Sequence, residues 1–348
     1  MSQPLPVATP LPGAETAETV ETMDNVETWL ASLGFAPRGI EPLPGDVSPR
    51  RYARVVLADG ATAILASYPP EIRSTCPLYL RTGEILTAAG VRVPHVLGSS
   101  CEQGWMLLED LGPRTVGELR ERPWSELRPY FESARALIDR IAALPAEHAA
   151  EIAVLNPLLG SELLKQELAQ TWNLFLEPRG LTGDARLTAA LRAALDALCD
   201  RLGEETPVPC HRDFMVRNLM PLEDAEGGIA VLDHQDMRLG PPEYDLASLL
   251  NDTIFPPPEA EEELLREVDR VRYHRAAAQR TLKAVGTYTK FSLRGAHRHL
   301  PLIPPTLGRC LEHFARTPEG APLADDLARA WAPVQQAAWG PLPEAAEG

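Results

Sequence analysis

The sequence predicts an α+β protein with two lobes, a small β-rich lobe followed by a larger helical lobe. Up to about residue 111, short stretches of β-branched and aromatic residues alternate with turn residues, a pattern typical of strands and hairpins. Beyond that point, apolar residues recur at helical spacing over long segments. The chain has 348 residues, 45% of them hydrophobic, which is enough for one large or two modest domains with a substantial core.

Each lobe contains a series of elements that the pattern predicts. In the first lobe, apolar spacing predicts a helix from Met23 to Leu33, and the segments RYARVVL and TAILASY predict a β-hairpin. A second helix and another pair of strands complete this lobe. The helices expected in the second lobe lie at 124–144, 161–176, 185–202, 242–252, 259–293 and 304–316. The expected divisions of the chain are a disordered tail at 1–22, the first lobe at 23–111, the second lobe at 112–340 and a flexible tail at 341–348.

The composition excludes several classes of partner. The chain carries 33 basic and 49 acidic residues, a net charge of −16, so its surface repels nucleic acid and anionic membranes. No apolar run reaches the roughly 18 residues of a membrane span, and the N-terminus lacks the pattern of a secretory signal. The five cysteines form no CxxC pair, which argues for reduced thiols and against a zinc site. We therefore expect a cytoplasmic protein.

The strongest local signal is the segment HRDFMVRN at 211–218, which has the form HxDxxxxN. This is the spacing of a phosphoryl-transfer loop. A carboxylate such as Asp213 can orient an attacking hydroxyl and accept its proton, and the amide oxygen of Asn218 can bind magnesium. His211 is interpreted either as a general base or as a packed histidine that shapes the loop.

Two further motifs follow this loop. The apolar strand IAVL ends in Asp233, fifteen residues after Asn218, where a second oxygen ligand for magnesium is expected. The alternative is a turn aspartate at the end of a strand. The segment GPPEYDLA at 240–247 begins a helix, and Asp245 lies in its first turn. We expect Asp245 to hydrogen-bond the 211–218 loop and hold it in place, besides its favourable interaction with the helix dipole.

Together these motifs resemble the aminoglycoside phosphotransferase and choline kinase superfamily. The forms DHQD at 233–236 and GPPEYDL at 240–246 are most similar to the branch of anomeric N-acetylmuramate and N-acetylglucosamine kinases. The resemblance covers about residues 23–320. It implies a protein-kinase-like fold, ATP and Mg²⁺ as cofactors, and an amino sugar as the small-molecule substrate. The implied reaction phosphorylates the anomeric hydroxyl to give the sugar 1-phosphate in peptidoglycan recycling.

The first lobe departs from a typical kinase in its nucleotide-binding residues. Only three lysines occur and the first is Lys165, so the usual lysine on the third strand is missing. The loop GDVSPR holds one glycine and cannot cradle phosphate as a glycine-rich loop does. The resemblance implies that adenine binds backbone groups of the hinge. The expected cofactor-binding residues are Ser48, Arg50 and Arg51 for phosphate, with Arg54 as a further cationic candidate, and Leu107, Glu109 and Leu111 for adenine.

Candidate substrate residues lie on two later helices. Arg280 and Lys283 share one helical face, which is either a cationic wall for substrate or a solvated stripe. Glu167 would accept hydrogen bonds from sugar hydroxyls, and Trp172 is either a stacking platform or a core residue. The alternatives in function are a kinase for an aminoglycoside, choline or an amino alcohol, and a catalytically weak nucleotide-binding protein. The sequence leaves open the preferred sugar, the oligomeric state and the role of His234, which replaces the usual Phe.

Overall fold

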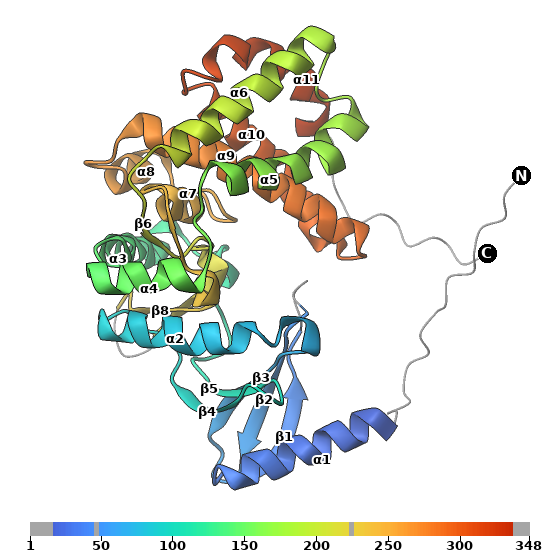
Figure 1. The fold of residues 1–348 in the computed structure, drawn as a ribbon, viewed down its shortest axis with the longest axis vertical. Coiled ribbons are helices and arrows are strands. Elements are labelled where there is room, and N and C mark those ends of the chain that lie inside the picture. The colour runs from blue at the N-terminus through green and yellow to red at the C-terminus, as the bar shows by residue number, and fades with distance from the viewer. Residues whose placement is uncertain (1–16, 45–48, 223–225, 337–348) are drawn as a thin grey trace, which may run out of the picture. The chain divides into compact units, whose positions relative to one another are not determined.

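The computed structural model describes residues 17–44, 49–222 and 226–336 (Figure 1). The chain forms two compact units, one made of residues up to Pro69 with Val96–Asp110, the other of Pro70–His95 with the chain from Leu111 onward. The expected first lobe, 23–111, differs from this division at Leu111 and in the segment 70–95, whose helix packs within the second unit. The predicted α+β class, with a sheet first and a mostly helical remainder, is confirmed.

The first unit is an antiparallel sheet of five strands with one helix. The strands follow the order β1-β2-β3-β5-β4 and span Pro37–Pro42, Arg51–Leu57, Thr62–Ser67, Trp105–Glu109 and Val96–Ser100. Helix α1, Ala17–Ser32, begins six residues before the predicted start, within the expected tail. Its Leu30 is fully buried in the core with Val55 and Leu107. Ser48 and the tails at 1–16 and 337–348 lie outside the described residues.

The second unit is helical and carries two short strand pairs. The pairs are β6, Val208–Cys210, with β9, Arg238–Gly240, and β7, Leu219–Pro221, with β8, Ile229–Val231. Its α-helices are α2 Thr75–Ala88, α3 Trp124–Ala142, α4 Ala146–Leu155, α5 Ser161–Thr171, α6 Ala185–Gly203, α7 Tyr244–Leu250, α8 Pro258–Leu264, α9 Arg270–Leu293, α10 Ile303–Phe314 and α11 Ala324–Gln335. None of the helices in the described ranges is long and apolar enough to cross a bilayer.

Two expectations need correction. The helix predicted at 259–293 is two helices, α8 and α9, because Glu267 adopts a left-handed φ of 66° and the Asp269 side chain caps α9 by accepting the N–H of Arg272 at 3.0 Å. Cys199, Cys210 and Cys310 are free and buried, whereas Cys76 and Cys101 are disulfide-bonded, so the expectation of reduced thiols is wrong for these two. Spacing along the chain reveals adjacent CxxC pairs but not pairings made by the fold.

Helix α9 is the central helix of the second unit and packs against α5, α7 and α10. Its contact with α5 depends on Gly286, because a Cβ at this position would clash with the Oγ1 of Thr171 and lie 2.8 Å from its Cα. The Thr171 hydroxyl donates to the carbonyl of Leu282 at 2.9 Å and fixes the same crossing. This close approach brings the polar residues of α5 against those of α9.

We predict that Gly286→Ala lowers the free energy of unfolding by about 1–3 kcal/mol, because α5 and α9 must separate to accommodate the methyl group. Gly308→Ala in α10 is the matched control, since a Cβ there meets nothing within 4 Å. That control should be neutral or more stable by up to about 1 kcal/mol, because alanine is the better helix former. Urea unfolding of both variants tests this, and equal stability of the two would contradict the close-contact argument.

Candidate active site

The loop at 211–218 is held in shape by one buried carboxylate. Asp245, in the first turn of α7, accepts the backbone N–H of His211 at 2.6 Å and that of Arg212 at 2.8 Å. Its side chain is almost completely buried, and burial raises its pKa against the opposing effect of His211 and these two donors. Arg212 adopts a left-handed φ of 74°, a conformation that few non-glycine residues take without such support. The loop contact expected of Asp245 is therefore present in the fold.

His211 packs behind the loop. Its Nε2 lies 2.9 Å from the carbonyl oxygen of Leu232. Since a carbonyl can only accept, Nε2 carries the hydrogen. The ring is buried and meets Phe214 edge to face, with centroids 5.6 Å apart. Of the two interpretations of His211, this arrangement favours the packed histidine over the general base.

Asp213 is the accessible carboxylate of the loop, and its side chain is 32% exposed. Arg280 of α9 donates to its Oδ1 at 2.9 Å, and the Nε of Arg280 donates to the hydroxyl of Ser248, also at 2.9 Å. Within the described ranges no donor reaches Oδ2 of Asp213. Burial alone would raise the pKa of Asp213, but Lys283, Arg280 and Arg212 outweigh it and hold that pKa well below the ordinary range.

Asn218 and the residue before Asp233 are joined through a backbone hydrogen bond near Asp213. The amide nitrogen of Asn218 donates to the carbonyl of Asp213 at 2.8 Å, which leaves its amide oxygen as the atom able to bind a cation. The N–H of Leu232 donates to the carbonyl of Asn218 at 2.8 Å and so ties the two segments together. Asp233 adopts a left-handed φ of 59°, and Gln235 donates to its Oδ1 at 3.0 Å.

This oxygen pair fits Mg²⁺ better than a transition metal. Magnesium commonly takes one or two protein oxygens and completes its octahedral shell with phosphate oxygens and water. A structural zinc site would instead need several His, Cys or acidic ligands. Among the residues that the structure describes, no group of three or more His, Cys, Asp or Glu side chains could hold a metal ion. Asn218 and Asp233 therefore remain the candidate Mg²⁺ ligands.

An ionic network lies beside Asp213 and joins α5, α9 and the loop. Glu167 of α5 accepts from Arg212 at 2.7 Å, Lys283 at 2.9 Å and Gln279 at 3.1 Å. Arg212 also pairs with Asp236. Burial would raise the pKa of Glu167, but Lys283 and Arg212 outweigh it and lower that pKa. Burial lowers the pKa of Lys283 to about 8.

These contacts change the interpretation of the substrate candidates. The side chains of Glu167 and Lys283 are only 9% and 11% exposed and pair with each other, which favours an organising role over direct contact with a sugar. Of the two interpretations of Trp172, its burial favours the core residue over the stacking platform. The guanidinium of Arg192 lies 4.2 Å from its ring centroid. Sequence reasoning assigned no role to Ser248, Asp236 or Gln279, each of which has a partner far away in the chain. Two of them did give a signal, since Asp236 lies in the DHQD motif and Gln279 lies beside Arg280.

The nucleotide candidates of the first unit differ in their surroundings. Arg50 is buried, donates to the hydroxyl of Tyr52 at 2.8 Å and lies 5.1 Å from the ring centroid of Tyr68. Arg51 is exposed at the start of β2. Arg54 donates twice to Asp110, at 2.6 and 3.3 Å. Arg50 is thus buried, Arg51 is exposed and Arg54 is ion-paired, and all three remain cationic candidates for phosphate binding.

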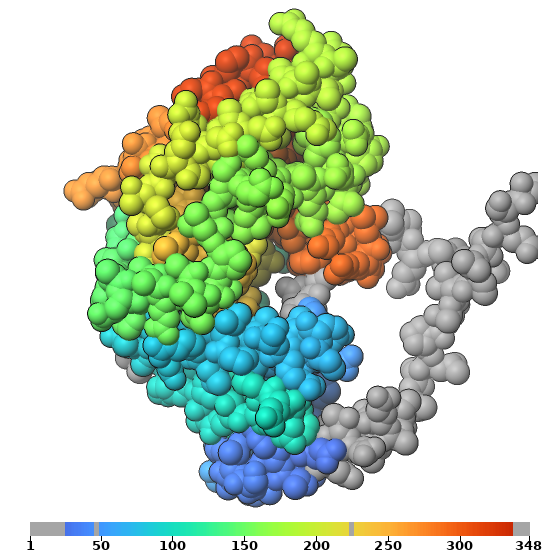
Figure 2. Space-filling model, viewed as in Figure 1, coloured from blue at the N-terminus to red at the C-terminus, as the bar shows by residue number. Residues whose placement is uncertain are grey.

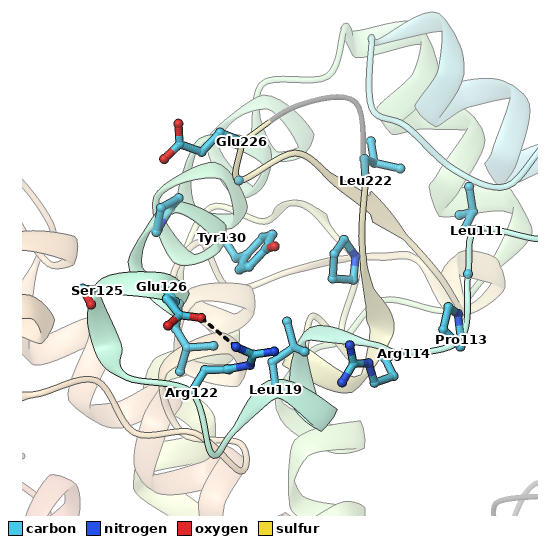
Figure 3. Close-up of a pocket in the computed structure, with 15 residues that line it drawn as sticks. Leu111, Pro113, Arg114, Leu119, Arg122, Ser125, Glu126, Tyr130, Leu222 and Glu226 are labelled. Atoms are coloured by element: carbon cyan, nitrogen blue, oxygen red, sulfur yellow. Dashed lines mark hydrogen bonds and ion pairs between the residues drawn. The ribbon is translucent and has the colours of Figure 1, made fainter.

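The residues expected to bind adenine at the hinge are Leu107, Glu109 and Leu111, and they lie in different surroundings. Leu107 is fully buried in the core of the first unit and Glu109, at the end of β5, is half-buried. Leu111 belongs to the second unit, where it lines a surface cavity of about 760 Å³. Figure 3 shows that cavity, with Arg122 paired to Glu126 at its rim. None of the loop or metal candidates lines it.

The chain combines a sheet unit with a helical unit. Its 211–218 loop presents a carboxylate with one open oxygen, and Asn218 and Asp233 supply further oxygen ligands. These are the features of a kinase-like phosphotransferase. The chain belongs to the phosphotransferase enzyme family, whose family model matches residues 39–280. The resemblance found in the sequence is thereby confirmed, and so is the enzyme class, a phosphotransferase with an alcohol group as acceptor.

Curated relatives agree with this assignment, and solved structures share the fold. The N-acetylmuramate/N-acetylglucosamine kinase of Pseudomonas aeruginosa is 29% identical over 84% of this chain and 88% of its own length. The protein of the same name from Neisseria meningitidis is 30% identical over 80% of this chain and 86% of its own length. The choline kinase LicA of Streptococcus pneumoniae has a similar structure, with a TM-score of 0.58 at 15% identity, covering 84% of this chain and 98% of that one. Aminoglycoside 2'-phosphotransferase-IIIa gives a TM-score of 0.60 with the same identity and coverage.

We predict that Lys283 makes stability rise with pH above about 8. The folded chain releases this proton near pH 8, whereas the unfolded chain keeps it until about 10.5. Between these values the unfolded state binds more protons, so the free energy of unfolding increases with pH. Lys283→Arg stays charged throughout and lacks this increase.

Urea unfolding of both proteins at pH 7 and pH 10 measures the effect. The wild type should gain on the order of 2 kcal/mol relative to the variant. All other groups titrate alike in the two proteins, so parallel pH curves would show that Lys283 keeps its proton in the folded state.

Proposed function

We propose that this chain is an ATP- and Mg²⁺-dependent sugar kinase that phosphorylates the anomeric hydroxyl of N-acetylmuramate, N-acetylglucosamine or both. The product is the sugar 1-phosphate, and the role is in peptidoglycan recycling. ATP as the donor places this reaction in the cytoplasm. Support for the sugar comes from relatives of this name that match most of the chain. The observation that carries the chemistry is Asp213, with Oδ1 held by Arg280 and Oδ2 open.

Asp213 has the geometry to position an attacking hydroxyl. A hydroxyl that donates to Oδ2 points its oxygen away from the loop. Oδ2 takes its proton as the new O–P bond forms and the bond between the γ-phosphoryl group and ADP breaks, with ADP as the leaving group. Arg280 keeps the carboxylate in one orientation by holding the other oxygen. Asn218 and Asp233 would hold Mg²⁺, which supplies charge stabilisation for the phosphates when bound. The protein thus contributes mainly positioning and electrostatics, as phosphoryl transfer requires.

The electrostatics of Asp213 favour an acidic acceptor. Its low pKa makes it a weak base. An anomeric hydroxyl is the most acidic hydroxyl of a reducing sugar, because the ring oxygen withdraws electron density from the carbon that bears it. Proton transfer to a weak base is less unfavourable from this hydroxyl than from an ordinary alcohol, which is compatible with anomeric phosphorylation.

The residues proposed to hold the donor nucleotide belong to the first unit, apart from Leu111. We assign the phosphates to Arg50 or Arg51, which lie immediately before and at the start of β2. The adenine would bind backbone groups of Leu107, Glu109 and Leu111, because the Leu107 side chain is buried in the core. Backbone recognition of this kind needs no particular side chain, which is why the hinge sequence carries little signal.

We predict that Asp213→Asn lowers kcat by about 10²–10⁴-fold, because the positioned base is lost. The amide oxygen of the asparagine can still accept from Arg280, so the fold and nucleotide binding should be retained. Steady-state kinetics with each sugar and calorimetric titration with ADP measure the two effects. A variant that keeps more than about a tenth of the wild-type kcat would contradict base catalysis by Asp213.

We predict that Arg280→Gln lowers kcat about ten-fold or more for N-acetylmuramate and N-acetylglucosamine alike, because Arg280 holds Oδ1 of Asp213 in place and its own side chain is only 8% exposed. Lys290→Gln is the control on the same helix, since Lys290 donates to Gln170 at 3.1 Å. Steady-state kinetics with both sugars measure the effect. A raised KM for N-acetylmuramate alone would show instead that Arg280 binds the lactyl carboxylate of that sugar.

A further inference from the structure

The residue after Asp233 makes a buried side-chain contact that the function proposed above does not use. His234 is fully buried in a short 3-10 turn, His234–Asp236, and its ring centroid lies 4.2 Å from that of Tyr79 in α2. Its Nδ1 lies 2.8 Å from the hydroxyl of Thr82, also in α2 and fully buried. Gly83 makes room for the ring, because a Cβ there would lie 3.2 Å from its Cε1.

The direction of this hydrogen bond depends on the contacts of Thr82. The Thr82 hydroxyl has one hydrogen, and its best acceptor is the carbonyl of Leu78 in the preceding turn, at 2.8 Å. When that hydrogen goes to Leu78, the oxygen of Thr82 accepts from His234 and its Nδ1 carries a hydrogen; in the other tautomer Thr82 donates to Nδ1. A phenylalanine at this position could fill the same space but could make neither hydrogen bond.

Helix α2 is a fixed support for this contact. Its Ile85 and Leu86 belong to the core of the second unit. On its outer face Arg81 pairs with Glu151 of α4, with 2.7 Å between Nη2 and Oε2, and Figure 2 shows α2 and α4 packed side by side. The other side of the turn is held by Asn156, whose amide donates to the carbonyls of Gln235 and Met237, both at 3.0 Å.

We propose that His234 is a positioning residue for the metal ligand Asp233, acting through its hydrogen bond to Thr82. Asp233 has a left-handed backbone and precedes the turn directly, so its carboxylate direction depends on how the turn is fixed. The bond to α2 anchors one end of the turn, and Asn156 anchors the other. This inference rests on the proposed role of Asp233 in binding Mg²⁺.

The test uses two matched pairs of variants. Thr82→Val removes the acceptor at nearly constant shape, and Thr82→Ser keeps it. His234→Phe keeps an aromatic ring without the donor, and His234→Asn keeps a donor near the position of Nδ1 without the ring. Calorimetric titration of ADP at a series of Mg²⁺ concentrations gives the Mg²⁺ concentration for half-maximal nucleotide binding, a readout that is independent of turnover. Thermal unfolding shows which variants are folded.

We expect Thr82→Val and His234→Phe to raise this Mg²⁺ concentration about 3- to 10-fold, and the double variant to raise it no further, as for the loss of a single hydrogen bond. Thr82→Ser and His234→Asn should stay within about twofold of the wild type. A normal His234→Phe with an impaired His234→Asn would show that ring packing, not the hydrogen bond, is what matters, and would overturn the proposal.

Asp233→Asn separates this inference from the function on which it rests. If Asp233→Asn weakens the Mg²⁺ dependence and Thr82→Val does not, only the role of His234 is wrong. If Asp233→Asn leaves the Mg²⁺ dependence unchanged, the metal assignment fails, and the role of His234 fails with it. The pair of His234 variants decides the question even if Thr82→Val does not fold.

Discussion

The candidate site depends on the two hydrogen bonds from the backbone of His211 and Arg212 to the carboxylate of Asp245. A buried carboxylate is costly unless donors compensate it, and a left-handed arginine is costly unless something holds it. The two backbone N–H groups compensate the buried carboxylate, and the carboxylate in turn holds Arg212 in its left-handed conformation. With Arg212 turned in this way, its guanidinium reaches Glu167, while the next residue, Asp213, is left accessible.

The polar face of α9 completes the arrangement. Arg280 and Lys283 are buried cations, and each has a carboxylate partner, Asp213 and Glu167. Buried ion pairs contribute little net stability compared with well-packed apolar residues, because desolvation offsets the attraction. They do fix orientation. The close approach of α5 and α9 at Gly286 therefore serves the geometry of the site, since it places Glu167 within reach of both Lys283 and Arg212.

Much of this site could be predicted because its parts are contiguous in the sequence. The loop at 211–218, the strand end at Asp233 and the helix start at Asp245 each carry a local pattern, and the α+β order of the lobes follows from periodicity. The contacts of α9 could not be predicted. Helical spacing shows that Arg280 and Lys283 share a face but not what that face meets, and their partners lie far away in the chain.

Some helix boundaries and long-range side-chain contacts could not be predicted, for similar reasons. The break between α8 and α9 depends on one left-handed residue and one capping side chain, and neither disturbs the apolar pattern enough to be noticed. Helices α4 and α11 were not predicted, since α4 is only ten residues long and α11 contains Pro333. The bond between His234 and Thr82 joins residues 152 apart in the sequence, so no local signal could reveal it.

Lys283 differs in its pKa from Lys165, another of the three lysines in the chain. With a pKa of about 8, it is a free amine in roughly half of the molecules at that pH, whereas Asp200 raises the pKa of Lys165 and keeps it protonated. A free amine is a nucleophile and an ammonium is not. A small aldehyde or active ester that reaches the ionic network would therefore find in Lys283 an amine that is half deprotonated near pH 8, in a chain with only two other lysines.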